Sequence, residues 1–572
     1  MVRFYPEVTV VGLRSDRGWI NYGTPHHVDG PALDTAAPQR IPILFLQQQP
    51  IYYILLLFFF SSFPSSSFFF FFFFFFLLLL LLLHLLKKSP SLLALYIPMD
   101  PLVWFLLVPL IVLLFFLPSS RKNLPPGPKP WPIIGNMLSM LTGAPHVELM
   151  KLARTHGPLM LVKFGAQPVI IASTPAAATE ILKANDRILS GRYVPHSLRM
   201  KNHIKHSVVW TDCTDNWKTL RRIARTELFS TKMLDAQLLV REKKVAEMDG
   251  KAVVITEFVF GTLLNILGHV VFSKDVFQYG EKGDKVGMQR LIREMLMIAA
   301  SPNLSDFYPI LAGLDLHGLL RACEARLNDV IGLWEGTVKE RRENNDHTKQ
   351  DFLEVLLANG FDDAQINAMF LETFGPGSET SSTTIEWAMA ELLRSPEKMS
   401  KVRAELDREV GKDKLTEFHL PRLQYLQACI KETMRLHPAA PFLIPHRAVE
   451  SCKVMGYTIP KDYQILVNAY AIGRDPDAWK DPNTFIPERF LESDLDYYGN
   501  HFHFIPFGAG RRICLGLPLA SRTIPMILGS LIHAFDWCLP DGMPGAQLEM
   551  KEKMSLTLVR DPSLVAVPKI RA

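Results

Sequence analysis

Cysteine is scarce in this sequence, which holds only six in 572 residues. No two of them have the C-x-x-C spacing of zinc ribbons and thioredoxin-like redox sites. Six cysteines spread over so long a chain are also too few for a disulfide scaffold. The sequence therefore argues against a zinc-stabilised or disulfide-rich protein, and a cysteine with a chemical function would have to act singly.

A strong charge of either sign is missing as well. Lys and Arg outnumber Asp and Glu by 62 to 57, which gives a formal net charge of +5 at pH 7. So small an excess does not indicate a nucleic-acid binder, and we expect no nucleic-acid partner. Apolar residues are abundant instead, at 48%, enough for a large buried core.

Two long apolar stretches precede the rest of the chain. The first, residues 51–86, contains nine consecutive Phe followed by seven Leu. Pyrimidine-rich DNA encodes runs of this kind, and Met99 begins a conventional anchor sequence. We therefore interpret residues 1–98 as an over-extended gene model; the alternative is a genuine targeting or second membrane segment.

The second apolar stretch, residues 102–117, predicts an uncleaved transmembrane signal anchor over residues 99–120. Arg121 and Lys122 follow it, which favours a cytosolic body by the positive-inside rule. The proline-rich residues 121–135 cannot continue a helix and predict a stiff hinge. Residues 136–572 then form the body of the protein.

The body has mostly helical periodicity and few strand-like runs. Residues 161–173 and 453–470 combine β-branched residues with Gly and Pro turns, as hairpins do. A long helix is expected over residues 364–393, beginning at Asp362 or Asp363 and ending before Pro396. We predict one large domain that is mainly α with a minor β portion (α+β).

One cysteine, Cys514, lies in the stretch "PFGAGRRICLG", between glycines and arginines. This is not a dinucleotide loop, because Ile513 stands where the third glycine is needed. A helix-like segment follows, and a helix N-terminus with free backbone N–H groups stabilises a thiolate. The setting fits an axial thiolate ligand of haem iron; the alternative is a structural cysteine.

The stretch resembles the cysteine-loop signature of the cytochrome P450 family, and the resemblance covers about residues 99–572. Five residues are in register with the signature: Phe507, Gly510, Arg512, Cys514 and Gly516. The resemblance implies that the cofactor is haem b and that Cys514 is its metal ligand. Phe507, Gly508 and Gly516 would shape the loop around the cofactor.

A second motif, "KETMRLHP", places Glu432 and Arg435 three residues apart on one face of a helix. An exposed pair of this kind is usually a weak surface bridge. "PERF", further along, supplies Arg489. In this order, the three residues resemble the buried structural triad of the P450 family.

A third motif, "FGPGSETSSTT", lies inside the predicted long helix. Pro376 frees the carbonyl of Glu372, so a local opening of the helix is expected there. Glu379 and Thr380 resemble the acid–alcohol pair with which the family delivers protons during oxygen cleavage. The alternative for Thr380 is a hydrogen bond to its own helix. Pro376 stands where the family usually has Ala or Gly.

The resemblance also implies contacts for the haem propionates and the substrate. Trp217 and Arg221 are four residues apart, and they are implied as propionate partners together with His446, Arg512 and, less securely, Arg447. An apolar substrate pocket is expected from four residues: Phe374, Gly377, Phe442 and Leu443.

The sequence motifs of the chain are similar to those of plant microsomal members of the P450 family that hydroxylate monoterpenols or benzylisoquinoline alkaloids. This implies a haem-thiolate monooxygenase that uses O2 and electrons from NADPH, through a partner reductase, on a small apolar terpenoid, alkaloid or phenolic. The expected location is the endoplasmic reticulum membrane, with the catalytic domain on the cytosolic side. Alternatives are a haem-thiolate isomerase or dehydratase, a phenol-coupling oxidase, and a non-catalytic membrane haem protein.

Overall fold

The computed structural model describes residues 123–140, 143–236, 238, 253–277, 287–344 and 351–571. The chain divides into two compact units, Met1–Val108 and Pro109–Ala572, and every described residue belongs to the second. The extension 1–98, the predicted anchor 99–120 and the first two residues of the predicted hinge lie outside the described residues.

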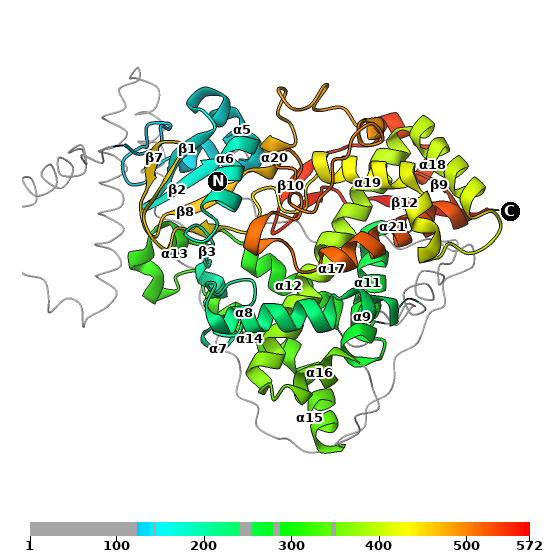
Figure 1. The fold of residues 1–572 in the computed structure, drawn as a ribbon, viewed down its shortest axis with the longest axis horizontal. Coiled ribbons are helices and arrows are strands. Elements are labelled where there is room, and N and C mark those ends of the chain that lie inside the picture. Colours follow the sequence, from blue (N-terminus) through cyan, green and yellow to red (C-terminus); the bar gives the residue numbers. More distant parts are fainter. Residues whose placement is uncertain are drawn as a thin grey trace, which may run out of the picture. The chain divides into compact units, whose positions relative to one another are not determined.

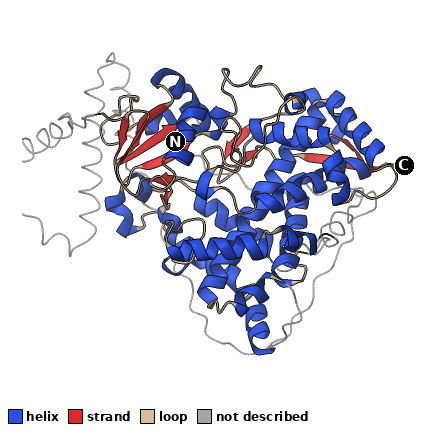
Figure 2. Cartoon of the chain, viewed as in Figure 1, coloured by secondary structure: helices blue, strands red, loops and turns tan. Residues whose placement is uncertain are grey.

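Helices form most of this unit, as Figures 1 and 2 show. The longer helices are α5 (Pro145–His156), α8 (Asp215–Ile223), α11 (Ile255–Phe272), α12 (Met288–Ala300), α14 (Leu319–Gly332), α15 (Glu335–Asn344), α16 (Phe352–Ala358), α17 (Asp363–Arg394), α18 (Pro396–Glu409), α19 (Gln424–Leu436) and α21 (Leu517–Ala534). The short ones are α6 (Pro175–Thr179), α7 (Lys201–Ile204), α9 (Thr231–Ala236), α13 (Leu304–Phe307) and α20 (Ala469–Ile472). The expected mainly α fold is confirmed.

The minor β portion is also present. A five-stranded sheet has the order β1-β2-β8-β5-β3, with strands Leu159–Phe164, Gln167–Ala172, Gln464–Val467, His446–Arg447 and Gly191–Arg192. Three smaller sheets comprise β6 (Cys452–Val454) with β7 (Tyr457–Ile459), β10 (Glu552–Met554) with β11 (Leu558–Arg560), and β4 (Val253–Val254) with β12 (Val565–Ile570) and β9 (Phe535–Cys538). The strands expected in residues 161–173 and 453–470 are therefore confirmed.

The predicted long helix is α17, and its start follows from the residues there. The Asp362 carboxylate accepts the Gln365 backbone N–H at 2.8 Å, and the Gln365 side chain accepts the Asp362 N–H at 3.0 Å. Most of α17 is buried, and apolar clusters join it to α11, α12, α19 and α21. Pro376 lies inside the helix without ending it, because the fixed φ of proline suits a helix and only one N–H is lost.

α11 is the one helix among the described residues that is long and apolar enough to cross a membrane. Of its 18 residues, 83% are buried within the fold. Its side chains pack against α17 in the core, as those of a core helix do.

A buried polar network joins segments that are far apart in the sequence. Glu552 of β10 meets His146 of α5 at 3.1 Å and His437, just after α19, at 2.9 Å. The other ring nitrogen of His437 lies 2.9 Å from Glu391 of α17. Trp387 stacks on the His437 ring with centroids 3.9 Å apart. The two ring nitrogens of His437 thus bridge carboxylates from two different segments, β10 and α17.

Candidate functional site

Cys514 lies in a tight loop between the 3-10 turn η8 (Gly510–Arg512) and the start of α21. The Cys514 N–H donates to the Phe507 carbonyl at 3.0 Å, and the Ile513 N–H to the Gly510 carbonyl at 3.1 Å. The Phe507 ring meets Tyr497 edge-on at 5.5 Å. These contacts fix the sulfur at the N-terminal end of an 18-residue helix.

Gly510 is required by close packing. Its φ is +66°, and a Cβ there would lie 2.1 Å from the Leu182 carbonyl oxygen. Arg511 beside it pairs with Asp186 at 3.0 Å. The loop is thereby pressed against the π-helical turn η2 (Glu180–Ala184). Gly508 also has a positive φ, +71°, which favours glycine.

The Cys514 side chain is exposed, and yet protein surrounds it closely enough for desolvation to raise the pKa of its thiol. Hydrogen bonds from the Gly516 and Leu517 backbone and the charge of Arg221 act in the opposite direction. The sulfur is thus accessible and at the same time closely surrounded by protein. The N–H groups are those that a thiolate ligand needs.

A cluster of cations lies beside this loop. Arg512 packs 4.6 Å from the Trp217 ring and Arg221 lies 5.3 Å from it. The Trp217 indole N–H donates to the Val208 carbonyl at 2.8 Å. His446 is also buried, and its Nδ1 donates to the Leu189 carbonyl at 2.8 Å. The structure thus brings together the residues that sequence reasoning assigned to the propionates.

Arg192 belongs to the same cluster and was missed as a cofactor residue. It sits on β3 directly opposite His446 of β5. Its guanidinium donates to the Val209 carbonyl at 3.1 Å and to the Ile444 carbonyl at 2.7 Å. β3 and β5 have two residues each, too few to show a strand pattern in the sequence.

The three arginines, Arg192, Arg221 and Arg512, lack a counter-anion. Burial lowers the pKa of each, for Arg221 to about 10, and repulsion from neighbouring arginines adds to the lowering at Arg192 and Arg221. The same two causes lower the pKa of His446 to about 3. Among the described residues, no carboxylate lies within ion-pair distance of the three, and their hydrogen bonds go to backbone carbonyls. A buried dicarboxylate would complete the cluster, so the residues fit the propionates of haem.

Arg447, by contrast, already has its anions. It pairs with Asp212, and with Asp462 at 2.6 Å. Its charge is therefore compensated without a cofactor, and the structure sets it apart from the propionate cluster.

α17 presents Thr380 and Pro376 on one face, one turn apart. Pro376 is exposed although it lies in the middle of the central helix, and Gly377 and Thr380 are half-buried. The Thr380 hydroxyl donates to the Pro376 carbonyl at 2.8 Å, which is the hydrogen bond within the helix named above as the alternative. The hydroxyl oxygen still has lone pairs that can accept from water.

Glu379 points away from this face, toward Thr557, whose hydroxyl lies 3.4 Å from its carboxylate. Desolvation raises the pKa of Glu379, opposed by the charge of Arg293 and by the Thr557 contact. The acid and the alcohol are therefore neighbours in sequence, and in this structure they have different partners.

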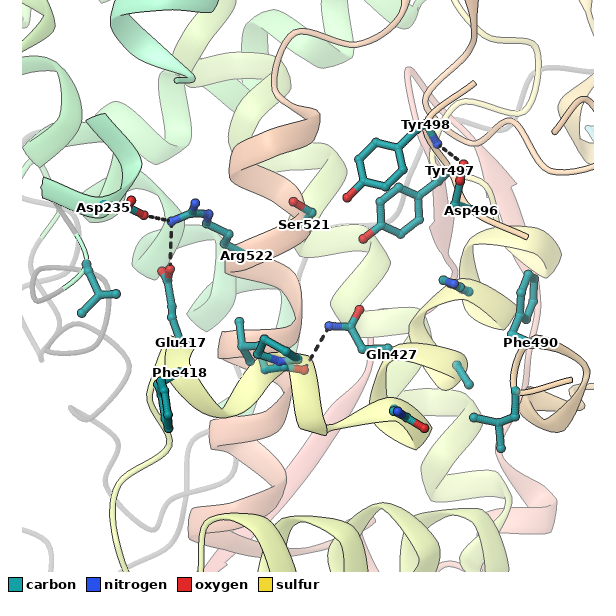
Figure 3. A pocket seen from close by; sticks show the side chains of 17 residues that line it. Asp235, Glu417, Phe418, Gln427, Phe490, Asp496, Tyr497, Tyr498, Ser521 and Arg522 are labelled. Carbon is teal, nitrogen blue, oxygen red and sulfur yellow. Dashed lines mark hydrogen bonds and ion pairs between the residues drawn. The ribbon is translucent and has the colours of Figure 1, made fainter. Parts of the chain in front are cut away.

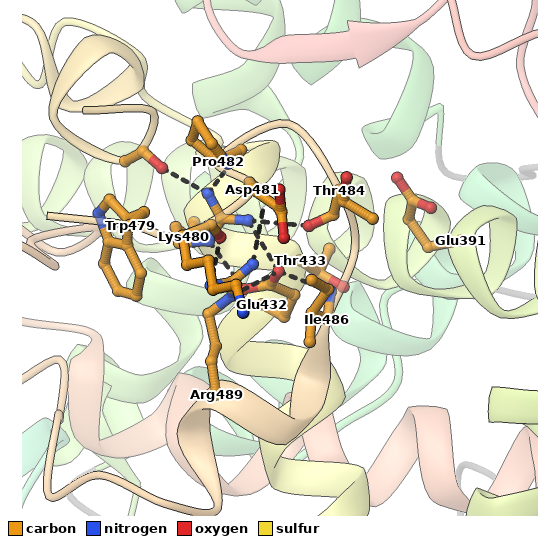
Figure 4. A network of polar contacts seen from close by, with 12 residues as sticks. Glu391, Glu432, Thr433, Trp479, Lys480, Asp481, Pro482, Thr484, Ile486 and Arg489 are labelled. Carbon is orange, nitrogen blue, oxygen red and sulfur yellow. Dashed lines mark hydrogen bonds and ion pairs between the residues drawn. The ribbon is translucent and has the colours of Figure 1, made fainter. Parts of the chain in front are cut away.

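The triad residues meet in the core, and Figure 4 shows Glu432 and Arg489 in this network. The Glu432 carboxylate receives the Arg435 guanidinium at 2.7 Å through both oxygens and Arg489 at 3.1 Å. It also accepts the Ile486 N–H at 2.8 Å. Glu432 and Arg435 are fully buried, and Trp479 lies 5.1 Å from the Arg435 guanidinium.

Of the four expected substrate residues, Phe374 lies elsewhere. It is fully buried and stacks on Phe272 at 5.7 Å and on Trp334 at 6.1 Å, because its side of α17 faces the helical core. Its ring has no free face for a ligand, which corrects the expectation. Phe442 is also buried, among apolar side chains of the large sheet.

Leu443 and Gly377 lie closer to the site. Leu443 is half-buried, has a φ of +52°, and its Cδ1 lies 3.7 Å from where a Cβ on Gly508 would be. It therefore borders the cysteine loop. A Cβ on Gly377 would meet Leu267 at 3.2 Å, so glycine allows close packing of α17 on α11.

A separate pocket of about 870 Å³ opens between η6 (Glu417–Arg422), α19, α21 and residues 490–498 (Figure 3). Arg522 on its wall pairs with Asp235 and Glu417. Neither Cys514 nor the cation cluster lines it, so its size does not mark the site.

Comparisons with known proteins agree with this geometry. The family model described as "Cytochrome P450" matches residues 125–566. The chain is similar to corytuberine synthase of Coptis japonica, 61% identical over 82% of this chain and 99% of that protein. It is also similar to a probable (S)-N-methylcoclaurine 3'-hydroxylase of Coptis japonica, 51% identical over 81% and 97%.

Two further likenesses extend these findings. Berbamunine synthase of Berberis stolonifera is 49% identical over 83% of this chain and 100% of that protein. Among solved structures, a zebra fish cytochrome P450 with progesterone superposes with a TM-score of 0.64 at 24% identity, covering 75% of this chain and 99% of that chain. At that identity the likeness shows the fold alone.

Proposed function

The chain belongs to the cytochrome P450 family, and from that membership we propose that it oxidises a benzylisoquinoline alkaloid. It is a haem-thiolate monooxygenase of plant alkaloid metabolism, with haem b as cofactor and electrons from NADPH through a reductase. When bound, the haem activates O2 so that one oxygen atom enters the substrate and the other leaves as water.

The observation that carries the proposal is the setting of Cys514. Its sulfur is exposed at a helix N-terminus and supported by two backbone N–H groups, with uncompensated arginines beside it. Cys514 would be the metal ligand, with Phe507, Gly508 and Gly516 shaping its loop. Trp217, Arg221, His446 and Arg512, together with Arg192, would hold the propionates.

Proton delivery is assigned to Thr380 and Glu379. The Thr380 hydroxyl donates to the Pro376 carbonyl, so it can accept from a water on the exposed side of α17. Desolvation raises the pKa of Glu379, which favours its protonated form and suits a proton donor. The two would act in sequence rather than through a direct bond.

The substrate is inferred from the relatives, which include named 3'-hydroxylases of (S)-N-methylcoclaurine. Hydroxylation of a related alkaloid ring is therefore the main proposal. A second candidate is intramolecular phenol coupling, because the 61% identical relative is named as a synthase and not as a hydroxylase. Product mass separates the two reactions, since coupling adds no oxygen.

Partner and location are proposed together. Lys218, Arg222 and Arg225 are exposed on and just after α8, on a different face from Trp217, and suit docking of an acidic electron donor. The apolar residues 102–117 and the cations that follow them support an endoplasmic reticulum membrane anchor with a cytosolic catalytic domain.

The test is expression with a plant reductase, from Met99 and from Met1, against a panel of benzylisoquinolines and monoterpenols. We expect NADPH-dependent turnover of a benzylisoquinoline and a thiolate-type reduced carbon monoxide spectrum. Cys514→Ser should abolish that spectrum, whereas Cys538→Ser, at an exposed cysteine of β9, should retain it. An unchanged spectrum in Cys514→Ser would refute the ligand assignment.

A further inference from the structure

The Glu372 carboxylate, on α17, accepts hydrogen bonds from backbone N–H groups of the loop that contains Val208 and Val209. The Val208 and Val209 N–H groups donate to its Oε2 at 2.7 and 3.2 Å, and the Ser207 hydroxyl donates to its Oε1. His203 lies 3.6 Å away, and the carboxylate is only 10% exposed. The acid is thus committed to residues 205–211, here called the 205–211 loop.

The opposite side of the same loop is held by the cation cluster. Its Val208 carbonyl accepts from Trp217 at 2.8 Å and from Arg512 at 3.3 Å. Its Val209 carbonyl accepts from Arg192 at 3.1 Å. The N–H groups of the loop therefore donate to the Glu372 carboxylate on α17. Its carbonyls accept from the residues proposed to hold the cofactor.

Glu372 also shares a face of α17 with Pro376 and Thr380, since the three are spaced four residues apart. The face is open at Pro376, whose side chain is exposed in the middle of a buried helix. One turn earlier, Glu372 draws the 205–211 loop onto α17. The loop thus closes one end of the open face on which the reaction is proposed to occur.

We propose that Glu372 is a positioning residue that fixes the 205–211 loop as a wall of the substrate pocket. The proposal rests on the proposed function for its substrate, but its geometry does not. Without the carboxylate, the loop keeps its bonds to the arginines and loses those to α17. Substrate binding should weaken, while cofactor loading stays intact.

The experiment compares Glu372→Ala with Glu372→Gln and with the control Asp363→Ala. Asp363 is on the same helix, and its exposed carboxylate pairs with Arg342 at 2.9 Å. Amide hydrogen exchange over residues 205–211 is measured on the whole protein. Exchange should be at least ten-fold faster in Glu372→Ala, intermediate in Glu372→Gln, whose amide oxygen can still accept, and unchanged in Asp363→Ala.

Pocket shape is read with 4-phenylimidazole, titrated spectroscopically into the haem-loaded protein. Its dissociation constant should rise at least three-fold in Glu372→Ala, and KM for the alkaloid should rise with kcat within two-fold of the wild type. Unchanged exchange in Glu372→Ala would overturn the proposal. Faster exchange with an unchanged dissociation constant for 4-phenylimidazole and an unchanged KM would also overturn it. If the wild type converts no alkaloid, the proposed function fails, and exchange with the 4-phenylimidazole titration still decides the role of Glu372.

A variant that does not accumulate would not end the test. Ser207→Ala removes the hydroxyl that donates to Glu372 and leaves α17 untouched; because the same hydroxyl accepts the Trp210 N–H at 2.7 Å, exchange is read at the Val208 and Val209 N–H groups, which donate to Glu372. The substitution should speed exchange at these two groups at least three-fold, and no change there would also overturn the proposal.

Discussion

The Glu432 carboxylate is the ion-pair partner of two arginines in the core, Arg435 and Arg489. Replacing it with Gln would leave Arg435 and Arg489 as buried cations without an anion, so we expect a loss of about 3–5 kcal/mol in unfolding free energy. Chemical unfolding followed by tryptophan fluorescence measures it.

The control is Glu488→Gln, whose carboxylate is 35% exposed and pairs with Lys401 at 2.6 Å. It should cost less than about 1 kcal/mol, because solvent screens an exposed pair. Equal losses in both variants would contradict a special role for the triad.

The role of the Thr380 hydroxyl in proton delivery can be distinguished by mutation from that of other hydroxyls on the same helix. Thr380→Ala should lower the fraction of NADPH electrons recovered in product about ten-fold or more, because the proton relay loses its hydroxyl. Thr384→Ala is the matched control, since the Thr384 hydroxyl donates to the Thr380 carbonyl at 2.9 Å in the same way. NADPH consumed and product formed are measured together, and an equal loss in the control would argue against the relay.

Single residues differ in how far the sequence predicts them. Cys514 and its glycines are recognisable because a tight loop places all its requirements within a few neighbouring positions. Arg192 and Glu372 are not, because their roles come from partners brought by other segments, His446 and Val208 among them. Phe374 was misjudged since spacing alone does not say which side of a buried helix faces the pocket.

Among the elements, α17 is the one whose course the sequence predicts best. Its cap at Asp362 and its end before Pro396 both follow from local chemistry. The expected opening at Pro376 does not interrupt it. The Ser378 hydroxyl donates to the Phe374 carbonyl at 2.6 Å, so side chains bind carbonyls along this stretch.

Pro376→Ala tests what the proline costs the helix. Alanine restores an N–H that can reach the Glu372 carbonyl, so unfolding free energy should rise by about 1–3 kcal/mol. Thermal unfolding of wild type and variant measures the change. A fall in stability would mean that the exposed ring contributes more by packing than its missing hydrogen bond costs.

The order of the strands, in contrast, was beyond sequence reasoning. β2 pairs in parallel with β8 although nearly 300 residues separate them, and β3 and β5 are two residues long. Such pairings depend on how the helices between them pack, and no local pattern encodes that. The sequence predicted the β1–β2 and β6–β7 hairpins, but not the five-stranded sheet that joins β1 and β2 to β8, β5 and β3.

At the scale of the whole described fold, the Glu552 network contributes to stability in acid. Hydrogen bonds from His146 and His437, and the charges of His437 and Arg474, hold the pKa of Glu552 well below its usual range despite burial. A carboxyl with a depressed folded pKa stabilises the fold above its unfolded pKa, about 4.3, and loses that contribution as pH falls.

Glu552→Gln should therefore be about 3–5 kcal/mol less stable at pH 7, because it removes the buried carboxylate that His146, His437 and Arg474 face. Between pH 4.3 and 3.3 the wild type should lose about 1 kcal/mol more than the variant, because the unfolded carboxyl is already half protonated at the start of this interval. Urea unfolding over this pH range measures both. Parallel pH profiles would show that Glu552 is not the titrating group.

The same network dictates when the fold can be completed during synthesis. His146 and Glu552 are 406 residues apart. At about 5–20 residues per second, a ribosome needs roughly 20–80 s to make the second after the first. Throughout that interval His146 lacks its acid partner, so α5 can complete its part of this network only after β10 has been made.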